Sequence, residues 1–138
     1  MLCSFNNVIL KTSRSEATLA AIGSGATVRF YLGAAPADAS VAVTGTFLGS
    51  LPCSYPFGVV TPGISGGAPA TLTASPIASG MGVFTGTPGF GRVTTSGSIG
   101  VIDLDCSAVG GSGAIIMTPD LITLNAPIGI SSIVIPEG

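Results

Sequence analysis

Apolar and polar residues alternate along much of the chain with the period of a β-strand. In the clearest run, residues 26–32, apolar side chains occupy every second position, and Thr27, Arg29 and Tyr31 fall between them. Strict alternation of this kind predicts a strand with one buried and one solvent-facing side. Gly33 and Pro36 follow directly and are expected to end the strand.

Similar short runs continue to the end of the chain. Strands are predicted at residues 44–51, 57–60, 71–74, 82–85, 91–95, 99–105, 114–118 and 129–135. Glycine and proline pairs separate them, including a predicted turn at Ala126-Pro127. Strands about 8–12 residues apart with such turns are typical of a β-sandwich or jelly roll, and no helix-length pattern lies between them to build parallel βαβ units. We therefore predict one domain over residues 1–138, with an all-β, antiparallel sandwich of jelly-roll or Ig-like type over 26–138.

One short helix is predicted ahead of the strands, over residues 13–23. Ser13 and Glu16 have capping-box spacing, and Gly23 stands where a left-handed C-cap is favoured. Leu19 and Ile22 give this helix one narrow apolar face, so it must dock on a larger element to be stable. Residues 1–12 are predicted as an N-terminal strand or arm, which is either the first strand of the sandwich or a strand added to a neighbouring subunit.

Charge is scarce and unevenly placed. Four basic and six acidic side chains make up 7% of 138 residues, against about 25% in an average domain. Apart from Cys53 and Tyr55, no ionisable side chain lies between Asp38 and Arg92. Sheet edges normally carry charges that prevent association, whereas permanent interfaces are depleted in charge. This gap predicts a surface covered in an assembly; the alternative is a surface that Ser, Thr and Gly keep polar.

Several classes of protein are excluded on composition. The balance of charge, with a net charge of −2, does not suit a nucleic-acid binder. No apolar run approaches the roughly 20 residues of a membrane span. No basic residue precedes the apolar stretch of residues 1–10, so a secretory signal is not expected and the chain is predicted to stay in the cytoplasm where it is made. Cys3, Cys53 and Cys106 lack disulfide or zinc spacing and are expected to be free thiols.

Candidate chemistry is sparse. The chain has no histidine, which removes Ser-His-Asp and Cys-His catalysis. Residues 63–67 match G-x-S-x-G around Ser65, but a nucleophile elbow requires a strand-to-helix turn and a histidine base, and no phosphate-binding glycine motif is present. Arg29 is interpreted as a surface charge or as the partner of a carboxylate. We expect no catalytic residue, cofactor or metal.

One acidic pair is the exception to this sparse chemistry. Asp103 and Asp105 are expected to share one strand face about 6–7 Å apart, a spacing compatible with an inverting glycosidase. With Asp120 they are also compatible with a weak calcium site. A solvated strand face is the interpretation that we favour, since the chain has no tryptophan to line a sugar cleft.

Five segments resemble a recurrent family of small tailed-bacteriophage virion proteins. They are LAAIG at 19–23, RFYLGAAP at 29–36, TGTFLGSL at 44–51, SGSIG at 96–100 and ISSIVI at 130–135. The resemblance spans roughly residues 4–137, and the stretch 62–91 departs from it by being richer in Gly and Pro. It implies a structural protein without enzymatic activity, namely a head decoration, or cement, protein.

The resemblance also implies partners and a location. The chain is expected to bind the major capsid protein on the capsid exterior, after synthesis in the host cytoplasm, as a homo-oligomer (trimer or dimer). Candidate interface residues are Phe5, Val8, Ile9, Leu10, Arg29 and Tyr31. The main alternative is a tail- or fibre-associated subunit that contacts a receptor. A cell-wall hydrolase acting through Asp103 and Asp105 and a secreted pilin-like adhesin are the remaining classes.

Overall fold

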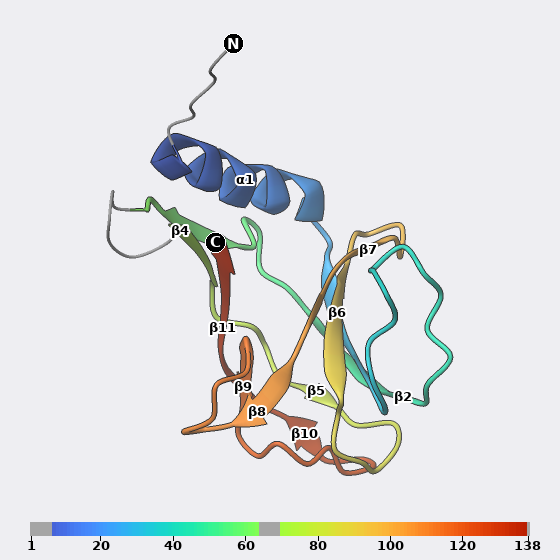
Figure 1. Cartoon of the computed structure of the whole chain (residues 1–138). Coiled ribbons are helices and arrows are strands. Elements are labelled where there is room, and N and C mark those ends of the chain that lie inside the picture. The colour runs from blue at the N-terminus through green and yellow to red at the C-terminus, as the bar shows by residue number, and fades with distance from the viewer. Residues whose placement is uncertain (1–6, 64–69, 138) are drawn as a thin grey trace.

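A computed structural model describes residues 7–63 and 70–137. It consists of two β-sheets packed together, with helix α1 (Asn7–Ile22) lying across one end of the pair (Figure 1). Apolar side chains from both sheets and from Ile22 form one continuous core. The all-β, sandwich-like architecture predicted from the alternation is therefore confirmed. No helix in the described part is long and apolar enough to cross a membrane.

The first sheet has four antiparallel strands in the order β2-β1-β6-β7. Its strands are β1 (Thr27–Tyr31), β2 (Phe47–Pro52), β6 (Phe90–Thr94) and β7 (Gly100–Leu104). On β1, Val28 and Phe30 are completely buried in the core, while Arg29 lies half-buried on the outer face. The period-two pattern thus orients this strand as predicted. The loop between β1 and β2 folds over the outer face, and its Ala39 carbonyl leaves no room for a side chain at Gly100.

The second sheet has five strands in the order β3-β4-β11-β9-β8. Its strands are β3 (Gly58–Thr61), β4 (Ala70–Ala74), β8 (Cys106–Ala108), β9 (Ile115–Met117) and β11 (Ile130–Glu137). Among the described strands, β8 and β9 form the one parallel pair, without the helical crossover that such pairs usually need. Gly110, at φ 94°, supports the tight return between them. Strand β8 was not predicted, because three residues are too few to show a period.

A two-stranded ribbon of β5 (Gly80–Met81) and β10 (Pro127–Ile128) lies at the end of the molecule opposite α1 (Figure 1). Isolated bridges from Gly82 to Leu124 and from Gly86 to Ile122 extend the contact between the two segments. The sequence predicted a strand at 82–85 and a turn at Ala126-Pro127, so β5 is displaced and β10 was missed. Each of these short strands exists because it pairs with a segment distant in the chain, so its own residues do not predict it.

Helix α1 begins at Asn7, so the prediction of a strand or arm over residues 1–12 is wrong for residues 7–12, and residues 1–6 lie outside the described part. The helix packs on β3, β4 and β11, where Ile22 is buried as its predicted face requires. Ser15 is also buried, at 2% exposure. A small hydroxyl residue therefore occupies this inward position of the helix, and hydrophobic periodicity cannot reveal such a position.

Candidate functional site

The predicted N-terminal interface is only partly described. Phe5 lies outside the described residues, and Val8 lies in the first turn of α1. Ile9 and Leu10 belong to the same helix, with 61% and 37% of their surface exposed. Strand addition through residues 7–10 is therefore not what the structure shows, because their backbone is helical. Ile9 and Leu10 remain accessible on the helix surface.

Arg29 and Tyr31 come together on the outer face of the first sheet. The Arg29 Nε donates a hydrogen bond to the Tyr31 hydroxyl at 3.2 Å, and its guanidinium carbon lies 4.8 Å from the centre of the Phe47 ring. Tyr31 in turn stacks on Phe90, with ring centres 5.5 Å apart. Among the described residues no carboxylate pairs with Arg29. The Tyr31 hydroxyl and the Phe47 ring therefore hold this charge in one position. Of the two interpretations of Arg29, the partner of a carboxylate is not found among the described residues.

A buried ion pair adjoins this cluster. The Arg92 Nε lies 2.6 Å from Asp103 Oδ1, its Nη2 lies 2.8 Å from Oδ2, and the two side chains are 8% and 10% exposed. The Arg92 Nη1 also donates to the Val41 carbonyl at 2.7 Å, which fixes the β1–β2 loop over the sheet. The hydrogen bonds that Arg92 donates to the Asp103 carboxylate raise the pKa of Arg92. The prediction that Asp103 lies on a solvated strand face is wrong, because the β6–β7 register places Arg92 directly opposite it.

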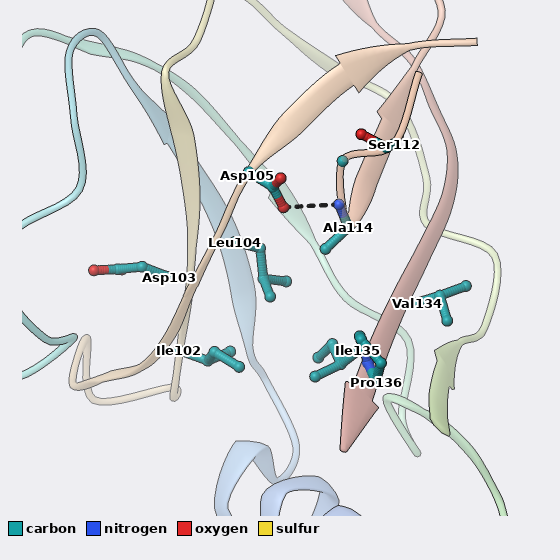
Figure 2. Close-up of a pocket in the computed structure, with 10 residues that line it drawn as sticks. Ile102, Asp103, Leu104, Asp105, Ser112, Ala114, Val134, Ile135 and Pro136 are labelled. Carbon is teal, nitrogen blue, oxygen red and sulfur yellow. Dashed lines mark hydrogen bonds between the residues drawn. The ribbon is translucent and has the colours of Figure 1, made fainter. Parts of the chain in front are cut away.

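The chain leaves the first sheet after Leu104 and enters the second sheet at Cys106, so Asp103 and Asp105 do not belong to the same strand. Figure 2 shows the Asp103 side chain pointing away from Asp105, whose Oδ1 accepts a hydrogen bond from the Ala114 N–H at 2.9 Å. Because β7 ends at Leu104 and β8 begins at Cys106, the rule that alternate strand residues share a face fails here. The two carboxylates therefore do not face one another as a glycosidase pair would. Within the described ranges no three acidic, cysteine or histidine side chains gather to hold a metal.

A groove of about 470 Å³ opens between β7 and β11, beside Asp105 (Figure 2). Strand β9 pairs with β11 as far as Ile133, and a backbone hydrogen bond from the Val134 N–H to the Ala114 carbonyl at 3.0 Å is the last contact on this edge of β11 that the described residues make. The core residues Leu104 and Ile135 line the groove. The carboxylates of Asp103 and Asp105 are already engaged by Arg92 and by the Ala114 N–H. The groove can therefore accept an apolar group, but it does not present two free carboxylates.

A larger apolar surface covers the β5–β10 end of the molecule. Five large apolar side chains there, each 46–54% exposed, form what we call the β5–β10 patch: Met81, Val83, Phe84, Leu121 and Leu124. Backbone bonds between Gly82 and Ala126 and between Gly86 and Ile122 hold the two segments together. Neither 80–86 nor 121–128 contains an Asp, Glu, Lys or Arg. The predicted charge gap indicated the first segment, but only the strand pairing reveals the second.

The described cysteines are free, partly buried thiols, as predicted. Burial raises the pKa of Cys53 to about 11. Burial, with a contribution from the charge of Asp105, raises the pKa of Cys106 to about 12. Both groups are therefore protonated and unreactive at neutral pH. Cys3 and Ser65 lie outside the described residues.

Comparison with known proteins adds no relative. The chain matches no family model, no curated protein and no solved structure. The resemblance to tailed-phage virion proteins consequently stays a prediction from the sequence motifs.

Proposed function

We propose that the chain is a structural subunit of a bacteriophage virion, a head decoration protein that binds the major capsid protein on the outside of the shell. The motif resemblance supports the class. The observation that carries the contact is the β5–β10 patch, where half-exposed apolar side chains from two uncharged segments form one end of the sandwich. Monomeric proteins rarely leave such a surface uncovered unless it has a partner.

The size of the patch fits the centre of an interface. Half exposure of five side chains, each presenting roughly 150–200 Å² when free, corresponds to about 400 Å². A standard interface buries about 800 Å² per partner, with an apolar centre and a polar rim. Burying the patch contributes about 10 kcal/mol from this side, comparable with the 4–15 kcal/mol that association costs. The patch therefore anchors binding, while rim contacts and a second capsid subunit determine its strength.

This arrangement supplies a mechanism for stabilising a shell. A rigid sandwich that contacts two neighbouring capsid subunits at once must lose buried area before those subunits separate. Oligomerisation of the chain as a trimer or dimer multiplies such contacts without further chemistry. No bond is made or broken, so the proposed role requires no catalytic group.

Binding to particles that lack this chain tests the proposal. Phe84→Asp and Leu124→Asp each place a charge within the patch and are expected to reduce co-sedimentation with the particles at least tenfold. Ile99→Asp makes the same kind of change at a 68% exposed residue in the β6–β7 turn and serves as the matched control, which should bind normally. Equal binding by all three variants, with unchanged melting temperatures, would contradict the proposed contact.

A further inference from the structure

A second surface feature lies on the outer face of the first sheet, away from the β5–β10 patch. It is a pocket of about 380 Å³ whose lining includes Arg29, Tyr31, Arg92, Thr94 and Ser98. Strands β1 and β6 provide its floor, and the β6–β7 turn contributes Ser98. Two guanidinium groups and several hydroxyl groups thus converge on one pocket in a chain that has only four basic residues.

The placement of the two arginines is electrostatically unfavourable. Arg29 and Arg92 are direct cross-strand partners in the β1–β6 register. Like charges at directly opposed positions destabilise a sheet. Asp103 neutralises Arg92 through two short hydrogen bonds, but no described carboxylate does the same for Arg29. No described residue therefore neutralises the charge of Arg29, which is available to an anion from outside the described residues.

Arg29 is also prepared to receive such an anion. Its Nε is occupied by the Tyr31 hydroxyl, and its guanidinium lies against the Phe47 ring. Within the described residues its Nη1 and Nη2 have no acceptor. A guanidinium fixed in this way offers two parallel donors, which is the geometry that binds a carboxylate through both oxygens.

The geometry points to a carboxylate-binding pocket centred on Arg29, with the hydroxyl of Ser98 near the bound group. One unneutralised guanidinium matches a group of charge −1 better than a phosphate dianion. The nearby Asp38 is not its occupant, because its carboxylate accepts hydrogen bonds from the Ser40 backbone and hydroxyl. In a protein partner the group would be an Asp or Glu side chain or a chain terminus. The inference rests on the pocket itself and is independent of the proposed function.

NMR of the full chain carrying ¹⁵N-labelled arginine tests the pocket directly. Sodium acetate is the probe, sodium chloride at matched ionic strength is the blank, and inorganic phosphate is the competing anion. We expect the Arg29 Nε–Hε resonance to shift saturably with acetate, in the millimolar range. The Arg92 resonance, held by Asp103, should shift much less.

Variants separate the pocket from general charge effects. In uniformly ¹⁵N-labelled protein, the backbone amides of Thr94 and Ser98 report on the pocket. Arg29→Gln should abolish their saturable response to acetate, Arg29→Lys should weaken it, and Tyr31→Phe should weaken it by releasing the guanidinium. Arg14→Gln, an exposed change on α1, should leave it intact. A response to acetate no larger than to chloride would overturn the inference, as would tighter binding of phosphate or a full response from a folded Arg29→Gln variant.

Discussion

Arg92 illustrates how a chain with few charges uses one of them inside the fold. It is buried, bonded through two nitrogens to Asp103, and bonded through a third to the Val41 carbonyl. The pair therefore joins β6, β7 and the β1–β2 loop. The residue types alone suggested a solvated acid, because the sequence does not specify which residue lies opposite Asp103.

Removing one member of this pair should destabilise the protein strongly. Asp103→Ala leaves a buried guanidinium without its counter-charge, and we expect the free energy of unfolding to fall by about 3 kcal/mol. Urea denaturation followed by circular dichroism measures the change. The double variant Arg92→Met/Asp103→Leu, which leaves no charge unpaired, should recover most of the loss. A loss under 0.5 kcal/mol for Asp103→Ala would show that the pair is unimportant for stability.

The raised pKa values of Cys53 and Cys106 predict that the free energy of unfolding decreases at high pH. The pKa of Cys53 is raised from an ordinary value of 9.0 to about 11, so the unfolded chain releases this proton first as the pH rises. The stabilisation is complete below pH 9 and is lost as the pH rises towards 11. The urea midpoint of the wild-type protein should be lower at pH 10.5 than at pH 8. The difference between the two midpoints should be smaller in a Cys53→Ala/Cys106→Ala variant.

Alkylation provides an independent check of the same thiols. In a Cys3→Ser background at pH 8, iodoacetamide should react with the native protein about 100-fold more slowly than with the unfolded chain, because each pKa unit reduces the thiolate about tenfold. Equal rates in both states would mean that Cys53 and Cys106 are exposed.

The sequence predicts a structural element well when the element's own residues alternate between apolar and polar in step with burial and exposure. Strand β1 alternates between core and surface and lies where the pattern places it. The start of α1, the short strands β8 and β10, and the β5–β10 patch were missed for a shared reason. Their burial depends on what packs against them, such as the strands that cover Ser15 on the inward side of α1 or the pairing of Gly82 with Leu124. Patterns within a short window do not contain that information.

A proline scan distinguishes the observed helix from the predicted one. In α1 as observed, Arg14 is an interior residue, so Arg14→Pro should lower the free energy of unfolding by about 3 kcal/mol. If the helix began at Ser13, proline at residue 14 would occupy the first helical position and be tolerated. Arg14→Ala is the control and should change stability by no more than about 0.5 kcal/mol. A tolerated Arg14→Pro would support the shorter helix.

In the whole molecule, several of the few charged residues lie in or beside the first sheet, whereas one end of the molecule is built from uncharged segments. The buried pair uses Arg92 and Asp103, Arg29 faces a pocket on the first sheet, and the β5–β10 end has no charged residue in either of its segments. The β5–β10 end, which lies opposite α1 (Figure 1), is therefore apolar, and the pocket beside Arg29 forms a separate polar face. We propose that the apolar end contacts the capsid shell and that the polar face remains available for a carboxylate.

Electron microscopy of intact virions that contain this chain tests the central proposal most directly. The account predicts density for the sandwich at symmetry-related positions on the outside of the head, with Phe84 and Leu124 facing the major capsid protein and α1 directed away from it. Density confined to the tail, or a capsid-bound sandwich whose β5–β10 end faces solvent, would contradict it.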